Sequence, residues 1–256
     1  MRKTSLLSAM VIAAFFTLVS CASKKDIVYL QNIEKSNNSE QASSFEPKLK
    51  ADDLLSIIVS AGTPELTMPF NMPQIQGNYS DQNNQSGIKT YLIDSYGNIE
   101  FPVIGTVKLG GLTRTEAINT LQGLIKPFIE KPSINLRILN FKISVLGEVT
   151  APGVYTTSSE RITLLEALGL AGDLTIYGVR QNILVIRETD GKKAFNRIDI
   201  TQADFMNSPY YYLTQNDVIV VEPNQTRMNA SAFGPNLTFT LSVVTFLTTM
   251  AILIFK

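Results

Sequence analysis

The fold is decided by the stretch "YLIDSYGNIEFPVIGTVKLGGLTRTEA", residues Tyr91–Ala117. Two β-rich runs within Thr90–Gly105 flank a turn at Gly97, a residue that takes positive φ without strain. A helix start follows, because Thr113 and Glu116 have the spacing of a capping box. The stretch therefore predicts a hairpin that leads into a helix.

The flanking residues complete a first domain. The apolar run Leu54–Val59 predicts a strand, and "SINLRIL" after Pro132 alternates as a second strand, with Ile134, Leu136 and Ile138 inward. We expect Pro132 to end the helix. One face of that helix carries the apolar residues Ala117, Leu121, Leu124, Ile125 and Phe128. Residues 49–139 are therefore predicted to form one compact α+β domain.

A second domain is predicted over residues 140–223. "FKISVLGEVTAPGVY" indicates two strands around a turn, and Thr163 with Glu166 repeats the capping box. A hairpin with Asp190-Gly191 at its tip precedes a last strand, Val218–Val221. We expect a helix across a small mixed sheet, of β-grasp type. An aspartate precedes a buried strand in each domain, Asp53 and Asp217, which is typical of polar turns.

The N-terminus has the pattern of a secretion signal. A basic start is followed by an apolar run, and residues 1–20 are predicted to be a signal peptide. Leu18–Cys21 resembles the bacterial lipobox, which implies a diacylglycerol on Cys21 and anchoring to membrane lipid. An ordinary signal peptide or an uncleaved anchor would also fit. Residues 21–48 are then the lipid anchor and a polar tether, and Gln76–Gly87 is a long polar loop.

The C-terminal residues 236–256 read "NLTFTLSVVTFLTTMAILIFK", without a charge before Lys256. About twenty helical residues span roughly 30 Å, so we expect a transmembrane helix after a linker at 224–235. Four hydroxyl side chains fall within an arc of roughly 60° on that helix: Thr238, Ser242, Thr245 and Thr249. They could line a lumen, pack against neighbouring helices, or bond to carbonyls of their own helix.

Composition excludes several classes of function. Lys plus Arg and Asp plus Glu both number 22, so no basic face is expected to hold nucleic acid. The chain has no His and a single Cys, which argues against zinc, a His-based triad and intrachain disulfides. No cofactor is expected. The carboxylates Asp52, Asp53, Glu148 and Asp173 fit turns better than catalysis, so we expect no enzyme.

Three short motifs in the first domain resemble the polysaccharide export domain: Asp94–Gly97, Pro102–Gly105 and Gly111–Thr113. "LGEVTAPGVYTTSSERITLLEALGLAGDL" and "YLTQNDVIVVEP" are similar to the soluble-ligand-binding β-grasp (SLBB) domain. A lipobox, both domains and an apolar C-terminus occur in this order in outer-membrane polysaccharide export lipoproteins. The chain departs from longer members in having one SLBB-like unit where they have two, and in its more apolar tail.

The resemblance implies a homo-oligomeric ring through which capsular polysaccharide or exopolysaccharide leaves the cell. It also implies an inner-membrane partner, a polysaccharide co-polymerase that is often a tyrosine autokinase. The acyl chains would lie in the outer membrane, with the domains in the periplasm and the tail crossing outward. A periplasmic glycan-binding or scaffold lipoprotein without a pore is the alternative.

Overall fold

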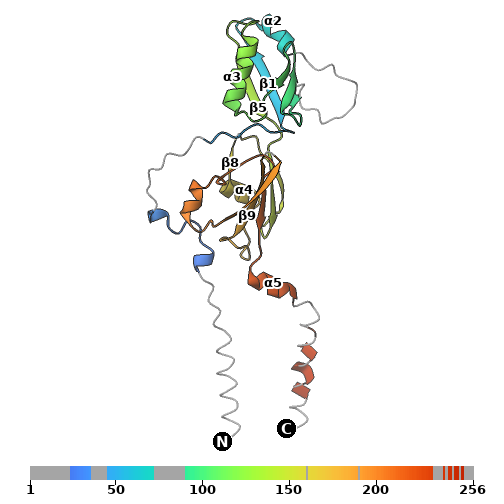
Figure 1. Cartoon of the computed structure of the whole chain (residues 1–256). Helices are drawn as coiled ribbons and strands as arrows, with labels where there is room; N and C mark the ends of the chain where they lie inside the picture. The colour runs from blue at the N-terminus through green and yellow to red at the C-terminus, as the bar shows by residue number, and fades with distance from the viewer. Residues whose placement is uncertain are drawn as a thin grey trace.

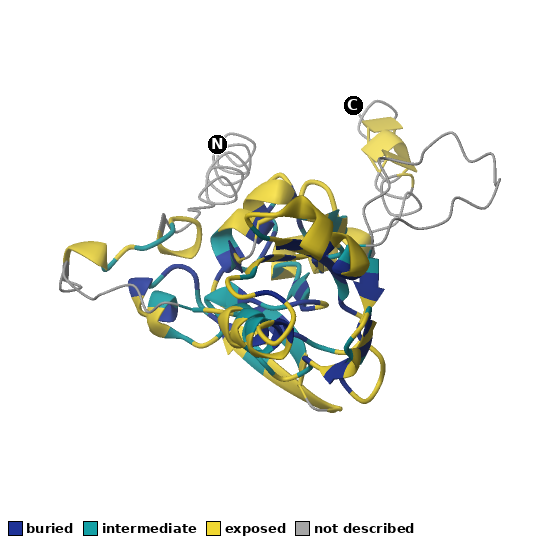
Figure 2. Cartoon of the chain, turned by 90° about the horizontal axis from the view of Figure 1, so that it is seen from above, coloured by how far each residue is buried: buried dark blue, intermediate teal, exposed yellow. Residues whose placement is uncertain are grey.

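A computed structural model describes residues 24–35, 45–71, 90–159, 161–189, 191–232 and eight residues of the tail: 239, 242, 243, 245–247, 249 and 250. Two mixed α/β domains are stacked end to end, and a helix leaves the second domain at the end away from the first (Figure 1). The mixed α/β class is therefore confirmed. Each domain has its own cluster of buried apolar residues, and the described residues of the tail are exposed (Figure 2).

The first domain has a three-stranded sheet in the order β2-β1-β5, with both pairings antiparallel. Its strands are β1 (Leu54–Ser60), β2 (Thr90–Leu92) and β5 (Ser133–Ile138). A separate hairpin joins β3 (Asn98–Phe101) to β4 (Gly105–Lys108), and α3 (Arg114–Ile125) packs against β5. Between β1 and β2 come the short helices α2 (Pro64–Thr67) and η3 (Met68–Phe70).

The predicted hairpin is wrong in its pairing. The turn exists, with Gly97 at φ 87°, but β2 pairs with β1, and β3 pairs with β4. The Asp94 carboxylate accepts backbone N–H bonds from Tyr96 and Asn98, each at 2.8 Å. These bonds fix the turn at which the chain leaves the β2-β1-β5 sheet and enters the β3–β4 hairpin.

Helix α3 begins as predicted and ends earlier. Both halves of the Thr113 capping box are formed. The helix stops at Ile125 because Pro127 has no N–H to donate and would clash with the preceding turn. The predicted apolar face is therefore too wide, since Leu124 and Phe128 are 41% and 56% exposed.

The second domain is built on a five-stranded sheet in the order β10-β9-β12-β6-β7. Its strands are β6 (Lys142–Gly147), β7 (Gly153–Thr156), β9 (Ile183–Thr189), β10 (Lys192–Ile198) and β12 (Val218–Val221). Strand β12 runs parallel to β6, and the other pairings are antiparallel. The first and last strands of this domain, β6 and β12, thus lie side by side and parallel within the sheet.

The helix of this domain is α4 (Leu164–Leu170), which begins with the predicted Thr163 capping box. Its buried residues share a core with the sheet: Leu164, Ala167 and Leu168. A two-stranded ladder of β8 (Ile162–Thr163) and β11 (Tyr212–Leu213) adjoins it, and η4 (Ala203–Asn207) precedes β11.

An N-terminal leader, residues 24–35, lies against the second domain and contains η1 (Lys24–Asp26) and η2 (Ile33–Lys35). The Leu30 and Gln31 N–H groups donate to the carbonyl oxygens of Ile200 at 3.3 Å and Thr201 at 2.7 Å. Within the predicted anchor and tether, residues 21–48, Leu30 and Gln31 are thus held to the second domain by backbone bonds. Residues 36–44 and the polar loop 76–87 lie outside the described residues.

The predicted linker at 224–235 contains a helix, α5 (Gln225–Ala232). It is tied to the second domain, because Arg227 pairs with Glu148 at 3.0 Å and lies over the Tyr177 ring. Helix α5 and η1 lie at the same end of the second domain (Figure 1). Among the described residues, no helix is long and apolar enough to cross a membrane.

Candidate functional site

Two turns of the same construction meet where the domains join. Lys50–Asp53 leads into β1 and Thr214–Asp217 leads into β12. In each turn the first residue donates its N–H to the last carboxylate at 2.8 Å. The third residue has positive φ, 68° at Asp52 and 65° at Asn216. The prediction of polar turns before buried strands is therefore confirmed at both positions.

The two buried carboxylates differ in their partners. Asp217 is held by the Arg187 guanidinium at 2.7 Å, and that guanidinium lies 4.6 Å from the centre of the Tyr210 ring. The Asp53 atom Oδ1 has no hydrogen-bond partner within the described structure. Burial therefore raises the pKa of Asp53 to about 6, although the Lys50 N–H opposes the rise.

The junction between the turns is fixed by polar contacts. The Lys50 ammonium donates to Thr214 Oγ1 and to the Glu188 carbonyl oxygen, both at 3.1 Å. Asn140, in the short connection from β5 to β6, accepts the Leu54 N–H and donates to the Asp52 carbonyl oxygen, both at 2.8 Å. The Lys50 bonds join the first domain to the second, and the Asn140 bonds join the connection between them to the first domain.

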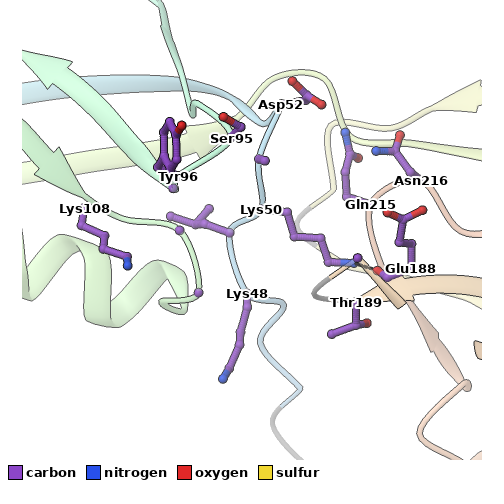
Figure 3. Close-up of a pocket in the computed structure, with 16 residues that line it drawn as sticks. Lys48, Lys50, Asp52, Ser95, Tyr96, Lys108, Glu188, Thr189, Gln215 and Asn216 are labelled. Atoms are coloured by element: carbon purple, nitrogen blue, oxygen red, sulfur yellow. Dashed lines mark hydrogen bonds between the residues drawn. The ribbon is translucent and has the colours of Figure 1, made fainter. Parts of the chain in front are cut away.

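A cleft of about 780 Å³ opens beside these contacts, and we call it the junction cleft (Figure 3). The first domain contributes the segment around Lys50, the turn at Tyr96 and the end of β4. The second domain contributes the end of β9 and the Thr214–Asp217 turn. Its polar and charged lining includes Lys48, Lys50, Tyr96, Lys108, Glu188 and Asn216. Sequence reasoning missed this site, because its residues come from five separate segments.

The predicted tail residues are described only in part. Thr238 and the lipidation candidate Cys21 lie outside the described residues. Ser242, Thr245 and Thr249 are exposed and helical, and the Thr249 hydroxyl donates to the Thr245 carbonyl oxygen at 2.7 Å. That bond is the third of the predicted roles, in which hydroxyls bond to their own helix.

The carboxylates weighed for catalysis have structural partners. Glu148 accepts a hydrogen bond from Thr175 at 2.8 Å, in addition to its Arg227 pair. Asp173 accepts the Tyr29 hydroxyl at 2.5 Å and therefore helps to hold the leader. Asp52 is exposed, whereas Asp53 is fully buried beneath the turn. The structure thus gives these groups roles in turns and docking contacts.

Comparison with known proteins identifies the first domain. Residues 41–139 match the family described as "Polysaccharide biosynthesis/export protein". The chain is also similar to the "EPS I polysaccharide export outer membrane protein EpsA" of Ralstonia solanacearum, with 28% identity over 70% of this chain and 48% of the relative. The corresponding protein of Ralstonia nicotianae is 29% identical over 55% of this chain and 38% of the relative.

The resemblance of the first domain to the polysaccharide export family is thereby confirmed for residues 41–139. The matched region contains the whole first domain and ends within the connection to the second. The chain spans half or less of the length of the curated relatives it matches.

Proposed function

We propose that this chain is a component of an outer-membrane translocon that exports capsular polysaccharide or exopolysaccharide from a bacterial cell. The observation that carries the proposal is the export domain over residues 41–139, supported by relatives named as export proteins of the outer membrane. The polymer passes because its size and hydration suit the bore of the translocon, and the protein performs no chemistry on it. The second domain acts as an SLBB-type β-grasp module.

The docked leader supports the placement at the membrane. Cys21, acylated in this proposal, precedes Lys24 by three residues, which reach at most about 10 Å. The acyl chains would therefore lie close to the end of the second domain that carries η1 and α5 (Figure 1). The first domain then projects into the periplasm, toward an inner-membrane polysaccharide co-polymerase.

In the proposed assembly, copies of the chain form a ring and residues 236–256 of each copy cross the outer membrane. The hydroxyl stripe of Thr238, Ser242, Thr245 and Thr249 faces a wet lumen or a neighbouring helix. Hydroxyls at such positions are favourable because water or a neighbouring helix accepts their hydrogen bonds.

The test is the double variant Thr245→Leu/Thr249→Leu in full-length acylated protein. We expect membrane insertion to persist, while polymer display at the cell surface falls and the mass of the oligomer in detergent changes. Val243→Leu/Met250→Leu, which alters apolar positions of the same segment, is the control and should leave both readouts unchanged. A strictly monomeric acylated protein would contradict the ring.

A glycan-binding or scaffold lipoprotein without a pore remains the second candidate. The bond from the Thr249 hydroxyl to its own helix favours it, because that hydroxyl is satisfied without a neighbouring copy. This candidate predicts a monomer or dimer in detergent and undiminished polymer export when residues 236–256 are deleted.

A further inference from the structure

The junction cleft has the shape and the side chains of a carbohydrate site. We propose that it binds an anionic sugar residue of the transported polymer, with the carboxylate of a uronic acid as the charged group. This inference rests on the proposed function, because it takes the polysaccharide as the molecule that the protein handles. The cleft volume of about 780 Å³ falls within the range of sites that hold small organic ligands.

Two glycines let backbone segments of the first-domain wall pack directly against each other. A Cβ atom on Gly110 would lie 2.6 Å from the Gly97 Cα atom, so side chains are excluded where the two segments cross. The Gly97 carbonyl oxygen accepts the N–H groups of Leu109 and Gly110 at 2.9 and 2.8 Å. This wall is therefore held by backbone hydrogen bonds and does not depend on side chains that could fill the space.

Two lysines give the first-domain wall its positive charge. Lys48 and Lys108 are exposed and line the cleft, and neither forms an ion pair within the part of the chain that the structure describes. Lys50 is different, since its ammonium is bound to Thr214 and Glu188. Lys48 and Lys108 are thus the groups available to a ligand carboxylate, with which an ammonium forms short, charge-assisted hydrogen bonds.

Tyr96 supplies a surface for a sugar ring. Its side chain is 79% exposed, although tyrosine rings are usually at least half covered in folded domains. The backbone below it is fixed, because the Tyr96 N–H donates to the Asp94 carboxylate at 2.8 Å. The ring lies on the same side of the cleft as Lys108 (Figure 3). An aromatic face with a cation beside it suits a pyranose ring that carries a carboxylate.

The second-domain wall carries polar groups that can bind sugar hydroxyls. Glu188 and Asn216 line it, opposite Tyr96 and Lys108 (Figure 3). A carboxylate accepts hydrogen bonds from sugar hydroxyls, and a side-chain amide both donates and accepts them. The first-domain side of the cleft thus has three lysines and one carboxylate, Asp52, and the other side has hydroxyl partners. An excess of cations together with hydroxyl partners is the combination that distinguishes an acidic sugar from a simple anion.

The binding experiment uses full-length protein in detergent and calorimetric titration with tetragalacturonate, maltotetraose and inorganic phosphate. We expect tetragalacturonate to bind, and to bind more weakly when salt is raised above about 50 mM. Lys48→Ala/Lys108→Ala and Tyr96→Ala should each weaken that binding by about tenfold or more. The control is Lys126→Ala, an exposed lysine that does not line the cleft and should leave the affinity unchanged.

The outcomes separate this inference from the proposed function. Absence of tetragalacturonate binding by an oligomer that still exports polymer overturns the cleft proposal alone. Equal affinity for maltotetraose would show that the cleft does not select acidic sugars. Binding of phosphate without binding of tetragalacturonate would show that the cleft recognises a simple anion and not a sugar. Equal weakening by Lys126→Ala also overturns the proposal. A failure of the proposed function itself would appear differently, as a monomeric acylated protein and as polymer export that is undiminished when residues 236–256 are deleted.

Discussion

At the scale of single residues, the most informative comparison is between Asp53 and Asp217. Both are fully buried at the end of the same kind of turn, and both accept an N–H bond of 2.8 Å from the first residue of that turn. Only Asp217 has an arginine beside it. The two carboxylates therefore affect stability differently: Asp217 is paired with a guanidinium, and Asp53 is favoured in its neutral form.

Removal of the Asp217 carboxylate should destabilise the second domain strongly. In Asp217→Ala the Arg187 guanidinium, whose side chain is 12% exposed, loses its only carboxylate among the described residues. A buried charge left without its partner costs about 3–5 kcal/mol of unfolding free energy, measurable by urea denaturation. Arg197→Ala is the control, because its pair with Glu222 is 53% and 41% exposed and should cost about 1 kcal/mol or less.

Asp53 should make stability depend on pH in the opposite sense to most carboxylates. Its pKa rises from 3.8 to about 6 on folding, so between these values the folded protein holds a proton that the unfolded chain has released. The resulting stabilisation is complete below the unfolded pKa and is lost as the pH rises through about 6. By this linkage it amounts to roughly 3 kcal/mol.

The variant Asp53→Asn cannot titrate and should lack this dependence. We expect its unfolding free energy, relative to the unaltered protein, to rise by roughly 2.4 kcal/mol between about pH 4 and pH 7, because pH 4 already lies slightly above the unfolded pKa. Urea denaturation at both pH values provides the measurement. A constant difference across that interval would show that Asp53 titrates normally in the folded protein.

At the scale of elements, local chemistry predicted helix starts and failed on strand pairing. Thr113 and Thr163 mark their helices correctly, because a capping box is complete within four residues. Strand β2 could not be placed in the same way. Its partner β1 is separated from it by two short helices and by residues 72–89, which lie outside the described residues, and pairing over that distance leaves no local pattern. The β6–β12 pairing is equally remote in sequence.

Substitution of Gly147 should disturb the pairing of β6 with β12. A Cβ atom there would lie 2.0 Å from the Val221 carbonyl oxygen, and its φ is 91°. Gly147→Ala would therefore force β6 and β12 apart, with an expected loss of about 3 kcal/mol or more of unfolding free energy. Gly123→Ala in α3, where the added Cβ meets nothing within 4 Å, should instead stabilise by about 1 kcal/mol. Thermal unfolding of both variants tests the contrast.

At the scale of the whole molecule, the leader and the junction cleft arise from contacts that no short window contains. Tyr29 meets Asp173, and the cleft unites Lys48 with Glu188 and Asn216. Composition predicted a tether that includes Gln31 and Asn32, but both residues form hydrogen bonds to the second domain. Charge and polarity alone do not distinguish these two cases.

Loosening the leader should be separable from unfolding the domain. In Tyr29→Ala/Asn32→Ala the leader loses its bonds to Asp173, Ala203 and Asp204. We expect faster amide hydrogen exchange across residues 24–35, while β6 and β12 remain protected. Ile33→Ala, at a side chain 44% exposed, is the control and should exchange as the unaltered protein does. Equal exchange in all three proteins would mean that these bonds do not hold the leader.

The parallel pairing of β6 with β12 has a consequence for the order in which the chain acquires its structure. The first domain is complete at Ile138, but the centre of the second sheet waits for Val218–Val221. The acceptors for the leader, Ile200 and Thr201, also arrive late. The amino-terminal end is therefore synthesised first and immobilised last, and in the proposed lipoprotein the enzymes that acylate Cys21 would meet it before it docks.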